Sequence, residues 1–157
     1  LTLIARDAAG NRLASGGLAV VFTKGTGTSD GMISAVTDGS DGSYTATFAA
    51  TTSGTARTIS ATIGGLPLTS TAPTITVTPG APSPATSTLT LSRSALVVGD
   101  TATLELTARD AAGNLVGTGG ATVAFIRGTG TSDATIGATI VIRFGLRRMS
   151  FSATETR

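Results

Sequence analysis

Acidic and amide side chains set among turn residues are the strongest candidates for ligand chemistry in this chain. They occur in three short stretches: Asp38 with Asp41, Asp7 with Asn11, and Asp110 with Asn114. Carboxylate and amide oxygens suit calcium. However, the spacing of an EF-hand loop and its terminal glutamate are absent, and turns also need Asp, Asn and Gly. We interpret all three as turns and predict no metal-ligating residue.

Two glycine-rich stretches superficially resemble loops that cradle a phosphate. They are Gly25-Thr26-Gly27 and its copy Gly128-Thr129-Gly130. No helical pattern follows either stretch, and no Lys-Ser/Thr pair closes it, so the helix dipole and the cation of such a loop are lacking. We interpret both as turns between strands and predict no cofactor and no cofactor-binding residue.

Catalytic residue types are scarce. The chain has no histidine and no cysteine, so the commonest general base and the thiolate nucleophile are missing, and zinc would have to be bound by carboxylates alone. Lys24 is the only lysine, and Arg127, which is too basic to accept a proton, occupies its position in a later copy of the sequence. A solvated strand end explains Lys24 better than a Ser-Lys dyad. We predict no catalytic residue and no enzymatic activity.

The excess of positive over negative charge comes from the C-terminal end of the sequence. The formal net charge is +2, but residues 134–157 carry four arginines and one glutamate, and the remaining residues have a net charge of −1. Arg143, Arg147 and Arg148 surround Phe144 without helical amphipathicity, which is thin support for a membrane or nucleic-acid patch. We predict no nucleic-acid partner. No apolar run is long enough for a transmembrane segment.

A long internal repeat dominates the sequence. Residues 1–30 align without a gap on residues 104–133, with 19 of 30 pairs identical and an offset of 103 residues. This period is typical of an immunoglobulin-like sandwich and is far longer than that of helical repeats or propeller blades. Because two complete sandwiches would need about 200 residues, we expect an all-β chain of tandem immunoglobulin-like β-sandwich repeats in which both copies are incomplete.

Hydrophobic alternation predicts the strands of the first copy. Tyr44, Ala46 and Phe48 should share one face, and Gly64-Gly65 should form a tight hairpin turn. Further core-facing sets are Leu1, Leu3 and Ala5; Leu18, Val20 and Phe22; Ile33 and Ala35; and Ile59, Ala61 and Ile63. A last strand is expected over Thr74–Thr78.

Three prolines in six residues, from Pro79 to Pro84, indicate a stiff connector. We therefore predict a first repeat over residues 1–78, which lacks its opening strand, a proline-rich linker over 79–86, and a second repeat over 87–157. A bent opening strand of the second repeat should place Leu89 and Leu91, then Leu96 and Val98, on the core.

Several stretches together resemble the bacterial immunoglobulin-like group 1 repeats of invasins and intimins, including the invasin third-domain-like repeats. They are ARDAAGN followed by SGG or TGG, VVFT, ISAVTDGSDGSYTATF, ISATIGG, and TSTAPTITVTPGAPS leading into STLTLSRSALVVGD. The resemblance covers residues 1 to about 138. It implies a rigid rod that holds an adhesive tip, located on the cell surface or outer membrane or secreted, with neighbouring repeats and a host-cell receptor as partners.

The second copy departs from the repeat after Ala138, where the Asp38–Gly42 turn is replaced by the letters IVIRFGLRRM. Ser150 to Thr154 offers a match to the strand at Ser43–Thr47. We hypothesise a reading-frame error or a truncation, which detection of the 139–149 peptide by mass spectrometry of the native product would reject.

Three functional classes remain open on the sequence. The first is a structural rod segment of a surface adhesin. The second is a direct receptor- or self-binding module that uses a sheet edge or the loop at residues 24–31. The third, an accessory sandwich of a secreted enzyme, has the least support, because Tyr44 is the only tyrosine and the chain has no tryptophan for stacking on sugars.

Overall fold

The computed structural model describes residues 1–117, 122–132, 134–143 and 146–153. All regular elements among them are β-strands paired in antiparallel fashion, so the all-β prediction is confirmed. The chain forms two compact units, unit 1 (Leu1–Thr78) and unit 2 (Pro79–Arg157), and each is described by itself.

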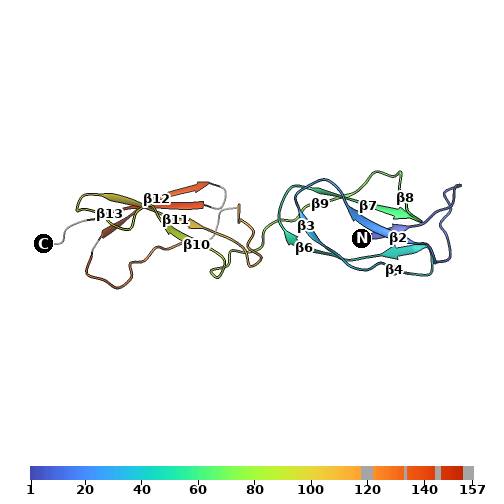
Figure 1. The fold of residues 1–157 in the computed structure, drawn as a ribbon, viewed down its shortest axis with the longest axis horizontal. Helices are drawn as coiled ribbons and strands as arrows, with labels where there is room; N and C mark the ends of the chain where they lie inside the picture. The colour runs from blue at the N-terminus through green and yellow to red at the C-terminus, as the bar shows by residue number, and fades with distance from the viewer. Residues whose placement is uncertain (118–121, 133, 144–145, 154–157) are drawn as a thin grey trace. The chain divides into compact units, whose positions relative to one another are not determined.

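Unit 1 contains nine strands in three sheets (Figure 1). The strands are β1 (Thr2–Ile4), β2 (Val20–Lys24), β3 (Asp30–Ile33), β4 (Thr37–Asp38), β5 (Ser43–Thr45), β6 (Phe48–Thr52), β7 (Arg57–Ile63), β8 (Leu66–Pro67) and β9 (Thr74–Ile75). One sheet has the order β1-β5-β4, another has the order β2-β7-β8 with β9 also paired to β7, and β3 pairs with β6.

The core of unit 1 lies between these sheets. Its buried residues are Leu3, Ala5, Val20, Tyr44 and Ala61. Tyr44 is only 1% exposed, and its hydroxyl accepts a hydrogen bond from the Leu18 N–H at 3.1 Å. The predicted alternation from Tyr44 to Phe48 is confirmed, because Thr45 and Thr47 are exposed.

The hairpin after β7 follows the predicted chemistry. Gly64 and Gly65 have φ angles of +58° and +82°, and Ile63 pairs with Leu66 on β8. Two positive φ angles in a two-residue loop match the right-handed twist of the strands that it joins.

Four expectations about unit 1 are wrong in detail. Leu18 is exposed and lies in no strand. Ala35 is exposed and lies in no strand, and Val36 packs against the core instead. The single strand expected at residues 44–48 is divided, because β5 pairs with β1 whereas β6 pairs with β3. The strand expected over Thr74–Thr78 ends at Ile75, since the Val77 N–H is bonded to the Ser29 hydroxyl rather than to a strand.

Unit 2 contains one sheet with the order β10-β11-β13-β12. The strands are β10 (Thr88–Leu91), β11 (Thr101–Thr107), β12 (Ala134–Arg143) and β13 (Leu146–Ala153). The opening strand is shorter than predicted, and the expectation that Leu89 and Leu91 lie on the core is wrong, because they are 57% and 44% exposed. Leu96 and Val98 lie in no strand, because the chain turns there with a hydrogen bond from the Asp100 N–H to the Val97 carbonyl.

Strand β13 takes the position in unit 2 that β5 takes in unit 1. Leu146 pairs with Thr107 as Ser43 pairs with Ile4, which preserves the offset of 103 residues. The predicted match of Ser150 to Ser43 is therefore wrong. The backbone register survives although the side chains of the two strands differ, because strand pairing joins main-chain groups that every residue except proline supplies.

Candidate functional site

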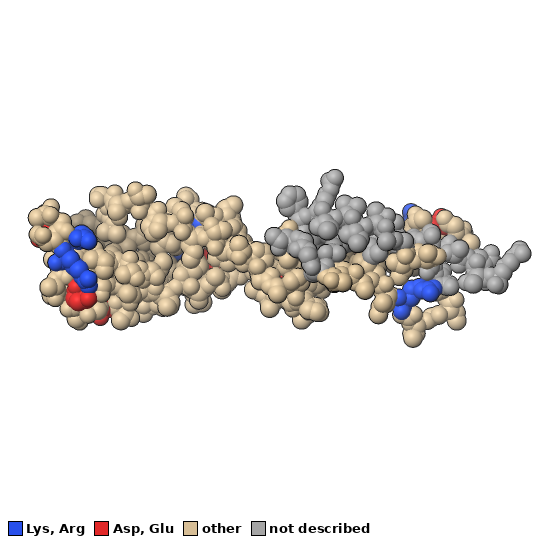
Figure 2. All heavy atoms as spheres, turned by 180° about the vertical axis from the view of Figure 1, so that it is seen from behind, with Lys and Arg blue, Asp and Glu red and all other residues tan. Residues whose placement is uncertain are grey.

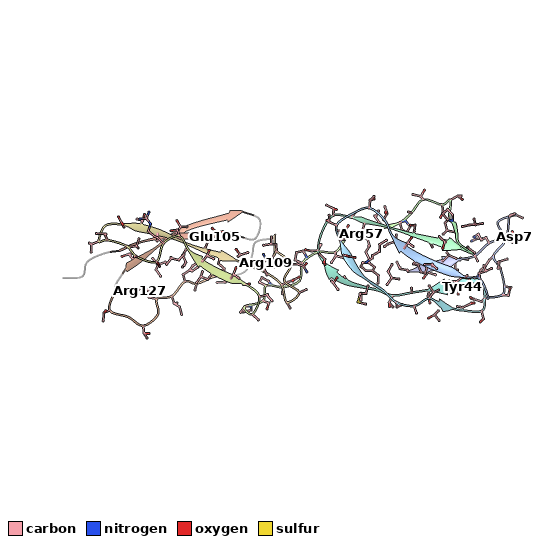
Figure 3. All side chains as sticks on the ribbon, in the orientation of Figure 1. Asp7, Tyr44, Arg57, Glu105, Arg109 and Arg127 are labelled. Atoms are coloured by element: carbon pink, nitrogen blue, oxygen red, sulfur yellow. The ribbon has the colours of Figure 1, made fainter. Side chains whose placement is uncertain are left out.

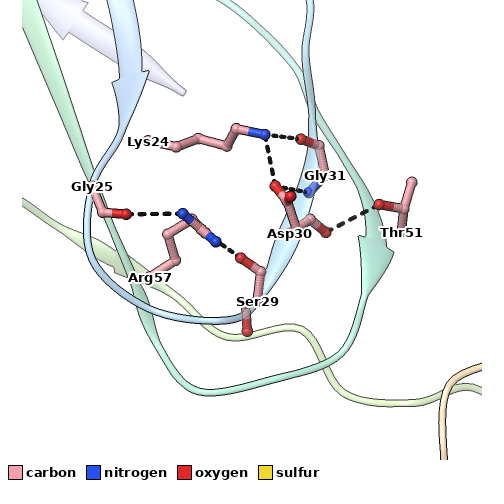
Figure 4. Close-up of polar contacts among 7 residues, drawn as sticks. All are labelled: Lys24, Gly25, Ser29, Asp30, Gly31, Thr51 and Arg57. Atoms are coloured by element: carbon pink, nitrogen blue, oxygen red, sulfur yellow. Dashed lines mark hydrogen bonds and ion pairs between the residues drawn. The ribbon is translucent and has the colours of Figure 1, made fainter.

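The loop from Lys24 to Gly31 is the candidate binding loop, and ion pairs and hydrogen bonds hold it internally (Figure 4). The Lys24 ammonium donates to the Asp30 carboxylate at 2.6 Å and to the Gly31 carbonyl at 2.8 Å. The hydrogen bond from Lys24, assisted by the Gly31 N–H, lowers the pKa of Asp30. Lys24 is therefore paired with a carboxylate and not with a serine, which is not the arrangement of a Ser-Lys dyad.

Arg57 supports the same loop from β7, and sequence reasoning did not single it out. Its guanidinium donates to the Gly25 carbonyl at 2.8 Å and to the Ser29 carbonyl. Ser29 is fully buried, and its hydroxyl accepts the Val77 N–H at 2.9 Å. The available signal was an arginine at the start of an otherwise apolar and β-branched strand, where it can reach an adjacent turn.

Four backbone amides of the loop, those of Gly25, Thr28, Ser29 and Gly31, are already used, which disfavours the phosphate-cradle interpretation. The Gly25 N–H donates to Thr58, and the Ser29 N–H donates to Thr55. Gly27 has a φ of +122°, and a Cβ added there would lie 2.2 Å from the Ala56 carbonyl oxygen. The glycine allows two backbone segments to approach each other.

The Asp7 and Asp110 turns have the same hydrogen bonds. In each, one carboxylate oxygen accepts the backbone N–H of Asn11 or Asn114 at 2.8 Å, and the other accepts that residue's amide at 3.0 Å. These bonds from the asparagine side chain are the first cause of a lowered pKa at both aspartates. They support the interpretation of both stretches as turns.

The connector, residues 79–86, packs on the Asp110 turn. The Gly80 N–H donates to the Asp110 carboxylate at 2.9 Å, the Ser83 N–H donates to the Arg109 carbonyl at 2.7 Å, and the Thr86 hydroxyl donates to the Asp110 carbonyl at 2.6 Å. As a result Asp110 is only 5% exposed, whereas Asp7 is exposed. Figure 3 labels Asp7 of the first turn and Arg109 of the second.

The Asp38 and Asp41 carboxylates also bond within unit 1. Asp38 accepts the N–H groups of Gly17 and Ser40, and Asp41 accepts from Ser43 and forms an ion pair with Arg12. The Ser43 hydroxyl is the first cause of a lowered pKa at Asp41. Among residues 1–117, 122–132, 134–143 and 146–153, no three carboxylates gather where they could hold a metal ion.

The arginine-rich segment lies largely outside the described side chains. Arg143 ends β12, Arg147 and Arg148 lie in β13, and Phe144 is outside the described residues. On the described part of the face shown in Figure 2, charged side chains are few, and at one end basic and acidic atoms lie side by side. Within the described part of the chain, no helix has the length and apolarity to cross a membrane.

Comparisons with known proteins agree on one group of relatives. The family described as invasin, domain 3, matches residues 1–80, just over half of the 157 residues. The structure of InvD from Yersinia pseudotuberculosis is 33% identical, with a TM-score of 0.52, over 99% of this chain and 44% of that chain. The structure of FdeC, a broadly conserved Escherichia coli adhesin, is 28% identical, with a TM-score of 0.54, over 98% of this chain and 49% of that chain.

A third solved structure supports the fold. Invasin, a bacterial integrin-binding protein, is 21% identical with a TM-score of 0.60, over 98% of this chain and 30% of that chain. This chain therefore spans less than half the length of each of these three solved chains. No curated protein matches it. The fold is that of immunoglobulin-like β-sandwich domains, and the chain belongs to the invasin domain 3 family.

Proposed function

We propose that this chain is a non-catalytic spacer segment in the rod of a bacterial surface adhesin. Unit 1 and the repeat that begins in unit 2 would be successive immunoglobulin-like domains, with residues 79–86 as the linker. The rod would stand at the cell surface and would present a receptor-binding domain encoded elsewhere. Its neighbouring repeats are then its main partners.

The attachment of the connector to unit 2 carries this proposal. Gly80, Ser83 and Thr86 are bonded to the Arg109–Asp110 turn, and the prolines restrict the backbone between these contacts. A linker held in this way enters its own unit along a fixed path, as a spacer requires. The loop at residues 24–31 supports the same role, because Lys24 and several of its backbone amides are bonded within unit 1 and Arg57 holds it from β7.

The spacer function is tested by exchange of the segment in a full-length adhesin. Replacement of residues 1–78 by an unrelated immunoglobulin-like domain of similar size should leave cell adhesion unchanged, while deletion without replacement should reduce it, because the tip would stand closer to the membrane. As a second readout, the purified 157-residue chain should show no saturable binding to host cells.

Saturable host-cell binding by the purified chain, abolished by substitutions in the loop at residues 24–31, would overturn the spacer proposal in favour of a direct binding module. Loss of adhesion after the same-size replacement would do the same. The matched control is a chain with Thr45→Ser, an exposed change on the outer face of β5 that alters neither core nor loop.

A further inference from the structure

The chain leaves unit 1 through Val77, which is held by loops rather than by a neighbouring strand. Strand β9 ends at Ile75, so residues 76–78 lie in no strand. The Val77 N–H donates to the Ser29 hydroxyl at 2.9 Å, and the Val77 carbonyl accepts the Gly54 N–H at 3.1 Å. Both main-chain groups of this residue are therefore bonded to parts of unit 1 that come far earlier in the sequence.

The Ser29 hydroxyl is directed at the chain exit and away from solvent. Ser29 is fully buried, although its neighbours Thr28 and Asp30 are exposed and half-buried. In Figure 4 its carbonyl faces the Arg57 guanidinium, while its hydroxyl points the other way, toward the chain beyond β9. Loss of a buried hydroxyl that accepts a main-chain N–H leaves that donor without a partner, which is costly.

A second segment, residues 53–57, ties the loop at Ser29 in place. The Thr28 N–H donates to the Thr55 hydroxyl at 3.0 Å, and the Thr55 N–H donates to the Thr28 hydroxyl at 2.7 Å. The Ser29 N–H donates to the Thr55 carbonyl at 3.0 Å. Gly54 permits this close approach, because a Cβ there would lie 2.4 Å from the Thr28 hydroxyl oxygen and 2.6 Å from the Ser29 nitrogen.

The two segments join two sheets at the point where the chain leaves. The loop at residues 24–31 runs from β2 to β3, and residues 53–57 run from β6 to β7. Strands β2 and β7 belong to one sheet, and β3 and β6 form another. Strand β9 is only two residues long and is bonded to β7. A pull on Val77 is therefore shared between two sheets, whereas β9 by itself would pass it to one.

We propose that the loop at residues 24–31 and the segment at residues 53–57 form an exit clamp, which carries tension from the connector into both of these sheets through Val77. This role rests on the spacer function proposed above, because a segment between a cell surface and an attached tip is loaded along its length. Since β9 precedes Val77 in the chain, the bonds of Val77 must break before a pull from the connector can peel β9 from β7.

Single-molecule pulling on the 157-residue chain tests the clamp under load. The chain has no cysteine, so Ala81→Cys with Thr45→Cys, both at exposed positions, can load the chain exit, and Leu66→Cys with Thr45→Cys can load unit 1 without the connector. At constant force, Ser29→Ala should raise the unfolding rate of unit 1 about tenfold in the first geometry, because one buried donor loses its acceptor. In the second geometry the rate should rise at most about threefold. Equal increases, or no increase in either geometry, would overturn the proposal.

Amide hydrogen exchange tests the clamp without load. In Ser29→Ala the Val77 amide should exchange about tenfold faster, while the Ala5 amide, which is bonded to a carbonyl at the other end of unit 1, should change much less. Ser34→Ala is the matched control, since its hydroxyl also accepts a main-chain N–H, that of Thr47 at 3.0 Å, and it should leave Val77 unchanged. Equal acceleration at Val77 and Ala5 would mean that Ser29 supports unit 1 as a whole, and would reject a local clamp.

Thr55→Val keeps both measurements decisive if Ser29→Ala does not fold. Thr55 is exposed, and valine removes the hydroxyl that accepts the Thr28 N–H while keeping the shape of the side chain. The Val77 amide should exchange about threefold faster, and unfolding through the connector should accelerate by a similar factor. No change in either would overturn the clamp. Because neither measurement involves host cells, its failure is distinct from failure of the spacer function, which the exchange of residues 1–78 in an adhesin tests.

Discussion

Unit 1 and unit 2 contain the same six letters, GTGTSD, at residues 25–30 and 128–133. In unit 1 they follow β2 and lead into β3, and the loop is fixed by Arg57 from β7. In unit 2 the residues before them, 123–127, form no strand. The same six letters therefore follow a strand in unit 1 and an irregular segment in unit 2.

The Asp7 and Asp110 turns, in contrast, have the same structure in the two units. Each contains the letters ARDAAGN, and each forms the same set of hydrogen bonds within five residues. The turn carries its own partners in the sequence, whereas strand β2 depends on a strand more than thirty residues away. Local chemistry suffices for the turns, and non-local pairing decides the strands.

The largest expected difference between the units lies in their cores. Leu3→Ala should destabilise unit 1 by about 2–4 kcal/mol because it empties a buried position between two sheets. Leu106→Ala, at the equivalent position, should destabilise unit 2 by only about 1 kcal/mol, since Leu106 is half-buried. Amide hydrogen exchange measures the two units separately. Equal losses of protection would contradict the view that only unit 1 has a closed core.

The next largest difference in stability is expected between substitutions of Gly27 and Gly130, the equivalent glycines of the GTGTSD segments in the two units. Gly27→Ala should cost unit 1 about 1–3 kcal/mol, because its φ is +122° and the new Cβ would meet the backbone of Ala56 and Arg57. Gly130→Ala is the matched control: its φ of +158° is closer to an extended strand, and the added Cβ would meet nothing within 4 Å. Urea unfolding of both variants gives the comparison. A larger effect at Gly130 would show that the loop of unit 2 is as tightly enclosed as that of unit 1.

Arg57→Met tests whether a single side chain from β7 fixes the loop. Loss of its bonds to Gly25 and Ser29 should destabilise unit 1 by about 1.5–2 kcal/mol and should speed exchange of the Ser29 amide. Methionine keeps the apolar stem, so packing is largely preserved. Protection of the Ala102 amide on β11 serves as the internal control. If the Ser29 amide exchanged at an unchanged rate, the hydroxyl bond to Val77 would be the main support of the loop.

Much of unit 1 could be predicted from the sequence because its alternation and its turn residues agree. Tyr44, Ala46 and the Gly64-Gly65 hairpin behave as the pattern indicates. The pattern could not show that the strand around Ala46 divides between two sheets, because alternation across a strand is the same whichever sheet receives it. Nor could it reveal the bonds of Arg57 to the loop, which join residues about thirty positions apart. The predictions that no residue binds a metal or a cofactor and that none is catalytic stay predictions.

Strand β13 offers a way to make the two units more alike. Its register places Arg147 opposite Leu106, where Tyr44 lies opposite Leu3 in unit 1. Arg147→Tyr should stabilise unit 2 by about 1 kcal/mol, because an aromatic residue suits a pleated surface beside leucine. Slower exchange of the β11 amides is the expected result. Arg148→Tyr, one residue along and opposite Glu105, is the control, and an equal gain there would show that the gain does not depend on pairing with Leu106.

The smallest expected effect is the pH dependence of the two shared turns. The pKa of Asp7 and of Asp110 is lowered below 3.8 by the asparagine side chain, and at Asp110 next by the Gly80 N–H. A carboxylate whose pKa is lowered by folding stabilises the folded state above its unfolded pKa, and this contribution is lost as the pH falls through the folded value. As the pH falls below 3.8, the Gly80 amide resonance should therefore begin to shift with the titration of Asp110. The Asp110→Asn variant should abolish this shift and Asp7→Asn should not. A Gly80 resonance that titrates with Asp7, or an Asp110 midpoint above 3.8, would mean that the connector is not held by the Asp110 carboxylate.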